Sequence, residues 1–86
     1  MKIGYFADGP WAHNAFQKII SNKLFKINFI VSRFNKQDPI LKKLATKYKI
    51  DFLIIKNVND EDSIQIFKSY KCDIFVSMSF NQIIKN

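Results

Sequence analysis

The sequence predicts an α/β fold, with a parallel sheet of four strands in the order 3-2-1-4 and helices on both faces. Four short apolar runs alternate with segments whose apolar residues recur at helical spacing. This alternation is typical of parallel strands joined by right-handed helical crossovers. The chain has 86 residues, of which 48% are hydrophobic. That length supports one domain with its own core and excludes a second one.

The first half of the chain supplies two strands and one helix. Residues 2–7 are predicted to form a short buried strand, which ends at the turn signal of Asp8, Gly9 and Pro10. A helix is expected from Trp11 to about Lys23, and a second strand over residues 27–31. The apolar residues at helical spacing in the predicted helix are Ala12, Ala15, Phe16, Ile19 and Ile20.

The second half repeats this pattern. Asp38 and Pro39 predict a helix start, with Asp38 as the N-cap and Pro39 in the first helical position. Residues 52–55 form a continuous apolar run that predicts a third strand covered on both faces. The acidic run at 59–62 suits the positive end of a third helix and is interpreted as its start rather than as a metal or catalytic cluster. A fourth strand is expected over residues 72–78. The residues expected to face the core from the two helices are Ile40, Leu41, Leu44, Ala45 and Tyr48, and then Ile64, Phe67 and Tyr70.

This order of elements is typical of one half of a Rossmann-like fold, and its topology predicts where a ligand binds. In the order 3-2-1-4 the switch point lies between the first and fourth strands, where a crevice opens at their carboxyl ends. Two loops should line that crevice: residues 8–11 after the first strand and residues 79–82 after the fourth.

Several common sites are excluded by residue type. Gly4 and Gly9 are the only glycines, so neither a dinucleotide fingerprint nor a phosphate-binding P-loop is present. Gly9 either permits a tight turn or lets a ligand approach the backbone, and the sequence leaves both readings open. One cysteine, Cys72, and one histidine, His13, allow no internal disulfide and no zinc cluster.

A hydrolase is also disfavoured. Asp8, His13, Ser77 and Ser79 fall near one end of the predicted sheet, but the serines lack the flanking glycines of a nucleophile elbow. Cys72 is expected at the opposite end of the fourth strand from the histidine. We therefore interpret it as a buried thiol and the histidine as solvated or helix-capping.

The formal net charge of +7 favours polyanions in general, but its distribution argues against nucleic acid as a partner. The lysines are scattered along the chain and Arg33 is the only arginine, although specific base and phosphate contacts favour arginine. We interpret most of this charge as a solvated, lysine-rich surface, with a weak preference for phosphate-bearing substrates as a secondary interpretation. No apolar run approaches the length of a membrane span or a signal peptide core. We expect a cytoplasmic protein without a membrane partner.

Three segments carry a resemblance: MKIGYF at residues 1–6, DGPW at residues 8–11 and above all CDIFVSMSFNQII at residues 72–84. They resemble the N-terminal part of the formyltransferase family, which includes methionyl-tRNA formyltransferase, glycinamide ribonucleotide formyltransferase and the sugar N-formyltransferases. The last segment is most similar to the sugar N-formyltransferase branch. The resemblance extends over essentially the whole chain, which corresponds to less than half of a typical member.

The resemblance implies transfer of a formyl group from 10-formyltetrahydrofolate to an amine, with a folate and a nucleotide-linked amino sugar as the small-molecule partners. In the family, backbone groups matching Gln82 and Ile84 bond the pterin ring, and apolar side chains form the wall of its pocket; ordinary packing is the competing explanation for these apolar residues. The implied folate-binding residues are Phe80, Asn81, Gln82, Ile83 and Ile84. The implied substrate-binding residues are Asp8, Gly9, Pro10 and Trp11.

The sequence departs from the family where catalysis is concerned. The family's N-x-H segment and its catalytic aspartate have no counterpart here, so no catalytic residue is assigned. Residues 1–86 are expected to be a truncated N-terminal formyltransferase-like domain that is inactive alone. A noncatalytic small-ligand-binding domain or an RNA-associated accessory domain remains the alternative.

Truncation would leave the fourth strand at the edge of the sheet, where the family has a fifth strand. We expect self-association, or a partner chain, at this edge. The apolar residues expected to be poorly covered there are Ile74, Phe75, Val76 and Met78.

Overall fold

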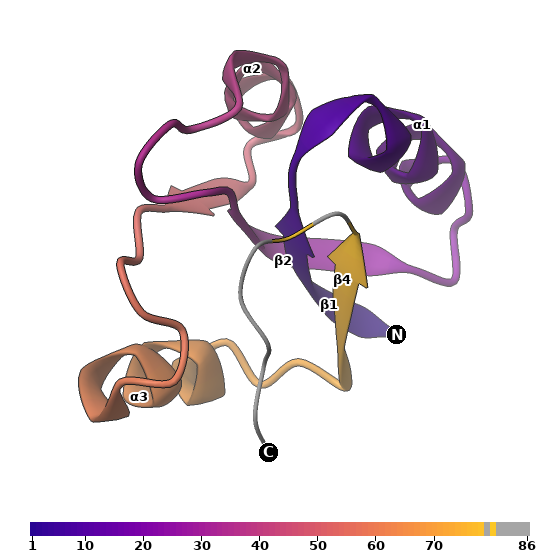
Figure 1. The fold of residues 1–86 in the computed structure, drawn as a ribbon. Coiled ribbons are helices and arrows are strands. Elements are labelled where there is room, and N and C mark those ends of the chain that lie inside the picture. The colour runs from indigo at the N-terminus through magenta and orange to yellow at the C-terminus, as the bar shows by residue number, and fades with distance from the viewer. Residues whose placement is uncertain (79, 81–86) are drawn as a thin grey trace.

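The computed structural model describes residues 1–78 and residue 80, and it confirms the predicted fold class. Within that part of the chain, one four-stranded sheet has the order β3-β2-β1-β4, and each pair of neighbouring strands is parallel. Strands and helices alternate along the chain (Figure 1). The elements are β1 (Lys2–Ala7), α1 (Gly9–Ile20), β2 (Lys26–Val31), α2 (Pro39–Tyr48), β3 (Asp51–Leu53), α3 (Glu61–Ser69) and β4 (Ile74–Met78).

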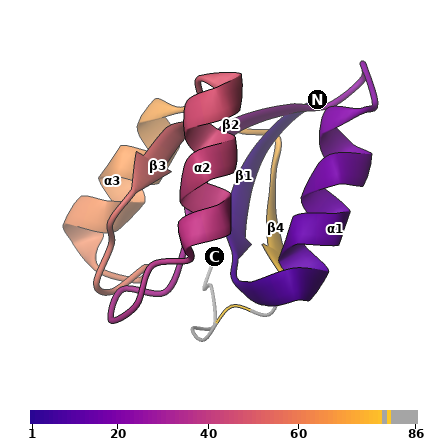
Figure 2. The ribbon, with the colours of Figure 1, turned by 90° about the horizontal axis from the view of Figure 1, so that it is seen from above.

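The first and last strands lie side by side, as the sequence predicted. Ile3 pairs with Ile74 at one end of the β1–β4 ladder, and Ala7 pairs with Met78 at the other. Both strands point the same way, so their carboxyl ends meet at one edge of the sheet (Figure 2). The backbone N–H of Asp8 extends this pairing by donating to the carbonyl oxygen of Met78 at 3.1 Å.

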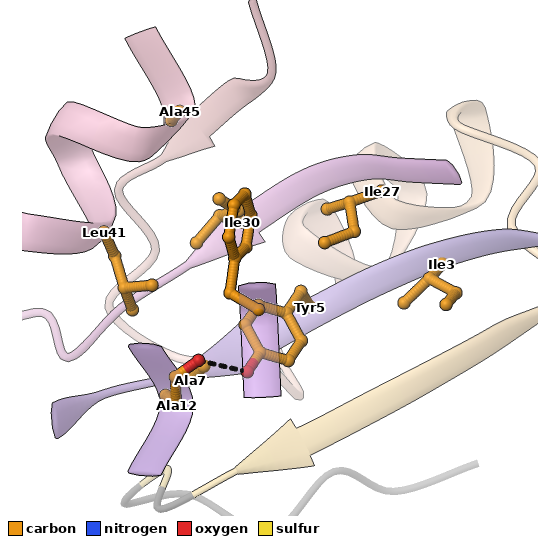
Figure 3. Close-up of a cluster of buried hydrophobic side chains, with 9 residues drawn as sticks. Ile3, Tyr5, Ala7, Ala12, Ile27, Ile30, Leu41 and Ala45 are labelled. Carbon is orange, nitrogen blue, oxygen red and sulfur yellow. Dashed lines mark hydrogen bonds between the residues drawn. The ribbon is translucent and has the colours of Figure 1, made fainter. Parts of the chain in front are cut away.

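The helices form a layer on each face of the sheet. Helices α1 and α2 cover one face, and α3 covers the other (Figure 1). On the α1/α2 face, Tyr5 of β1 is buried and its hydroxyl donates to the carbonyl oxygen of Ala12 in α1 at 2.7 Å (Figure 3). This bond ties the helix to the strand that precedes it. The buried residues of this face are Ile3, Tyr5, Ala7, Ala12, Phe16, Ile27, Ile30, Leu41 and Ala45.

The opposite face is built around aromatic rings. Phe6 lies at its centre, with the rings of Phe29, Phe67 and Phe75 at centroid distances of 5.5, 5.1 and 5.4 Å. The rings meet Phe6 edge-on, an arrangement that aromatic pairs favour. The buried residues of this face are Phe6, Phe29, Val31, Ile55, Val58 and Phe67.

Gly4 makes the aromatic packing geometrically feasible. A Cβ atom at this position would lie 2.5 Å from Cζ of Phe29 and 2.9 Å from Cδ1 of Phe75. Both distances are shorter than any ordinary van der Waals contact. Because Gly4 has no side chain, these two rings occupy the space in which a Cβ atom would lie.

The first helix differs from its predicted bounds at both ends. It begins at Gly9 rather than at residue 11, because Gly9 adopts a φ of +84° and turns the chain directly from the strand into the helix. It ends at Ile20 rather than near residue 23. Ser21 Oγ donates to the carbonyl oxygen of Gln17, and Asn22 Oδ1 accepts from the N–H of Leu24, so local side-chain bonds end the helix.

Several apolar positions are less buried than predicted. β3 has only three residues and ends at Leu53, so the prediction of a strand through residue 55 was wrong. Ile54 is exposed, while Ile55 packs into the aromatic face from beyond the strand. In α2, Leu41 and Ala45 are buried as predicted, but Ile40 and Tyr48 are exposed.

The edge strand β4 is incompletely covered. Ile74 and Phe75 are 41% and 42% exposed, whereas Val76 and Met78 pack partly against the α1/α2 face. The prediction of poor coverage is therefore confirmed for Ile74 and Phe75. Association through this edge stays a prediction.

We predict that Gly4→Ala destabilises the protein by about 1–3 kcal/mol, because the added methyl group overpacks the space held by Phe29 and Phe75. Urea unfolding followed by circular dichroism measures the change. Ser77→Ala on the exposed edge strand is the control and should change stability by less than about 0.5 kcal/mol. Equal stabilities for Gly4→Ala and the wild type would contradict this account of the aromatic face.

Candidate functional site

A cavity of about 420 Å³ opens at the carboxyl edge of the sheet, between the segment that follows β1 and the loop that follows β2. Its volume falls within the range of small-molecule sites. In Figure 2 the first turns of α1 and α2 lie at this edge of the sheet. The lining residues are Asp8, Gly9, Pro10, His13, Arg33, Lys36, Gln37, Asp38, Pro39 and Ile40.

The buried carboxylate of Asp38 links the starts of both helices. Its Oδ1 accepts from the N–H groups of Ile40 and Leu41, at 2.9 and 3.2 Å, which makes Asp38 the N-cap of α2 as predicted. Its Oδ2 accepts from the N–H of Gly9 at 2.8 Å and lies 2.7 Å from Nε2 of His13 in α1. We call these five residues the Asp38 cluster.

The hydrogen bonds of the Asp38 cluster determine its ionisation. Burial alone would raise the pKa of Asp38, but the bonds from Gly9, His13 and Leu41 outweigh that effect. The pKa of Asp38 is lowered from its ordinary 3.8 to about 2. The carboxylate therefore stays charged well into the acidic range.

The neighbouring Asp8 shifts in the opposite direction. Burial and a hydrogen bond with Asp38 raise the pKa of Asp8, and the nearby Arg33 opposes this rise. Arg33 reaches Asp8 directly, with Nε 2.8 Å from Oδ2. The residue that follows β1 is thus joined to the loop that follows β2 by an ion pair.

The predicted substrate loop lies only partly in this cavity. Asp8, Gly9 and Pro10 line it, whereas Trp11 is 76% exposed and is not part of the lining. The positive φ of Gly9 accounts for the glycine as a turn residue, which is one of the two readings that the sequence left open.

Phe80 is the one predicted folate-binding residue that the structure describes. The Phe80 ring lies 5.7 Å from the Phe6 ring, so it packs on the aromatic face of the sheet. The other predicted folate residues lie outside the described residues; they are Asn81, Gln82, Ile83 and Ile84. Ser79, which was considered for a hydrolase site, also lies outside them.

The remaining candidate groups are accounted for by local contacts. His13 is neither solvated nor a helix cap, because it is largely buried and contacts the N-cap carboxylate of another helix. Cys72 precedes β4 and so lies at the amino edge of the sheet, away from the cavity. Burial, followed by the charge of Asp73, raises the pKa of its thiol. These two residues do not form a nucleophile–base pair.

Sequence reasoning missed the contribution of the loop after β2. Arg33, Lys36 and Gln37 line the cavity, but the sequence predicted only the loops at residues 8–11 and 79–82 to line a ligand crevice. The predicted strand order could have identified this loop, because all parallel strands end at the same edge of the sheet and β2 neighbours β1 in that order. The loop after β2 should therefore lie beside the loop after β1.

Compared with known protein families and with curated proteins, the sequence matches none. Over residues 1–78 and 80, no group of three or more histidine, cysteine or acidic side chains is placed to hold a metal ion. No helix in this same part of the chain is long and apolar enough to cross a membrane.

We predict that Asp38→Ala destabilises the protein by about 1–3 kcal/mol, since it removes the cap of α2 and leaves the N–H of Gly9 without its acceptor. Asp60→Ala is a matched control. Asp60 is also an N-cap, but its side chain makes no capping hydrogen bond, so its removal should cost only a few tenths of a kcal/mol. Chemical denaturation measures both changes, and equal losses would contradict the role of the Asp38 cluster.

The same carboxylate predicts an acid dependence of stability. The pKa of Asp38 is lowered to about 2 in the folded protein, so its contribution is present above pH 3.8 and disappears as the pH falls through about 2. The stability difference between the wild type and Asp38→Asn should therefore shrink steadily as the pH is lowered from 5 to 2. Unfolding curves at several pH values measure it. A constant difference over this range would mean that the charge of Asp38 is unimportant.

Proposed function

We propose that this chain is the folate-binding portion of a formyltransferase, in which a formyl group passes from 10-formyltetrahydrofolate to the amine of a nucleotide-linked amino sugar. The observation that carries the proposal is the parallel pairing of β1 with β4. This pairing places the carboxyl ends of both strands at one edge of the sheet, and the proposed substrate and folate loops follow these two ends in the sequence. Ligands of open α/β sheets bind at such switch points.

Hydrogen bonding at this edge also supports the proposal. Asp8, from the proposed substrate loop, bonds through its N–H to Met78 of β4, two residues before Phe80. The Phe80 ring packs against Phe6, so this one residue of the proposed folate loop lies on the aromatic face of the sheet. The hydrogen bond between Asp8 and Met78 keeps the ends of β1 and β4 together, and two reacting ligands need binding groups that lie close together.

The chemistry of the pterin ring suits recognition by a loop. Its edge carries a row of hydrogen-bond donors and acceptors similar to that of a peptide. Backbone N–H and C=O groups at residues 82 and 84 would bind it whatever their side chains are, and apolar side chains nearby would exclude water.

The role proposed for these 86 residues is binding rather than bond formation. Formyl transfer needs groups that polarise the formyl carbonyl and move protons away from the attacking amine. The sequence contains no counterpart of the asparagine and histidine that perform these steps in the family. His13 does not replace them, because it is held by Asp38.

We predict that the protein binds the stable analogue 5-formyltetrahydrofolate saturably, and that Gln82→Pro weakens this binding about tenfold or more. Proline removes the backbone N–H at this position and so deletes a hydrogen bond to the pterin. Isothermal titration calorimetry measures the affinity. Gln82→Ala keeps the N–H and is the matched control, whose affinity should stay within about threefold of the wild type.

Two outcomes would count against the proposal. One is the absence of saturable folate binding by the wild-type protein. The other is salt-sensitive binding of RNA without folate binding, which would favour an RNA-associated accessory domain.

A further inference from the structure

The lysines are distributed unequally between the two helical layers of the protein. Helices α1 and α2, each taken with the segment that joins it to the next strand (residues 9–25 and 39–50), contain six lysines and no aspartate or glutamate. The corresponding stretch of the other layer, residues 61–73 with α3, contains two lysines and three acidic residues. Because α1 and α2 cover one face of the sheet and α3 the other, one side of the molecule is strongly cationic (Figure 1). We call these six residues the basic layer; they are Lys18, Lys23, Lys42, Lys43, Lys47 and Lys49.

The positive charge of the basic layer is available to a partner. All six lysine side chains are exposed. The carboxylates that flank the two helices in the sequence already have partners. Asp8 forms an ion pair with Arg33, and Asp38 is buried and caps α2. Asp51 accepts a hydrogen bond from the hydroxyl of Tyr70 at 2.6 Å.

Exposed apolar side chains accompany these lysines. Trp11, in the first turn of α1, is 76% exposed, and Leu24, shortly after the end of that helix, is 74% exposed. They are the most exposed large apolar side chains among residues 1–78 and 80. Trp11 precedes Lys18 by almost two helical turns, so both project from the same side of α1. In α2 the exposed Ile40 precedes Lys47 at the same spacing.

We propose that the basic layer docks the protein on the surface of a bilayer that contains acidic phospholipids. Lysines attract anionic headgroups without a fixed geometry, and each one near such a surface raises the affinity roughly fivefold. Trp11 and Leu24 would enter the boundary between headgroups and acyl chains, where tryptophan is enriched. The inference goes beyond the proposed function and does not depend on it.

Residue type favours a lipid surface over RNA as the partner. Arginine is better suited than lysine to nucleic acids because of its planar fork, and the basic layer contains none. Leu24 has no ring on which a base could stack, whereas its side chain suits a lipid boundary. The expectation that the protein has no membrane partner rested on the absence of a membrane span, and peripheral docking needs none.

The experiment uses vesicles of phosphatidylcholine with about 30% phosphatidylserine, and vesicles of phosphatidylcholine alone as the reference. Trp11 is the only tryptophan, so its fluorescence reports contact between the basic layer and lipid. We expect the protein to sediment with the acidic vesicles alone and the Trp11 emission to shift to shorter wavelength. Added salt should weaken both effects, because it screens exposed charges.

Two double variants test whether the basic layer is responsible. Lys43→Gln with Lys47→Gln, in α2, should weaken binding to acidic vesicles about tenfold or more. The matched control is Lys68→Gln with Lys71→Gln, which removes the same formal charge from exposed positions of the α3 layer. Its affinity should stay within about twofold of the wild type. Trp11→Ser removes an exposed ring and should weaken binding about threefold or more without changing the circular dichroism spectrum.

Three outcomes would overturn the proposal. Equal losses in the two double variants would mean that the net charge of +7, and not the basic layer, attracts the vesicles. An unchanged Trp11 emission in the presence of acidic vesicles would mean that this side of the protein does not meet the lipid. RNA binding that Lys43→Gln with Lys47→Gln weakens, without any vesicle binding by the wild type, would assign the basic layer to nucleic acid instead.

Discussion

The arrangement of the carboxyl edge depends on one buried carboxylate that serves two helices at once. Asp38 caps α2 through Oδ1 and receives the first N–H of α1 and the His13 ring through Oδ2. Its own N–H donates to Ser32 Oγ, which ties the cluster back to the end of β2. The two helices therefore cannot move apart at this edge without leaving buried donors unsatisfied, and such donors are costly. The cavity lies between two elements that are already held together.

Only the capping half of the Asp38 cluster was predictable from local sequence. The Asp38-Pro39 pair identifies an N-cap and a first helical residue without reference to the rest of the chain. The bonds to Gly9 and His13 join residues 29 and 25 positions away from Asp38. They depend on how α1 and α2 pack on the sheet, and that packing is not encoded in any local spacing. For the same reason the sequence suggested two explanations for Gly9, and its φ of +84° was needed to favour the turn.

Strand order was predictable because the alternation of strands and helices restricts the handedness and the order of crossovers. The exposure of individual side chains was not. Ile54 continues the apolar run of residues 52–55 but follows the last residue of β3 and points to solvent. Ile40 fits the helical spacing of its neighbours, yet it lies in the first turn of α2 at the cavity rim and is exposed. Apolar periodicity identifies the face of an element, whereas coverage at its ends depends on neighbours that are distant in sequence.

The Asp38 cluster also changes what the helix starts can do. An uncapped helix N-terminus attracts an anion through its N–H groups, but here Asp38 already occupies that position for both helices. A further anion at this edge would therefore depend on side chains rather than on the helix dipoles, and the two cationic side chains of the cavity lining, Arg33 and Lys36, both belong to the loop after β2. A change at Lys36 is expected to leave these contacts undisturbed, because its exposed side chain takes no part in the hydrogen bonds of Asp38.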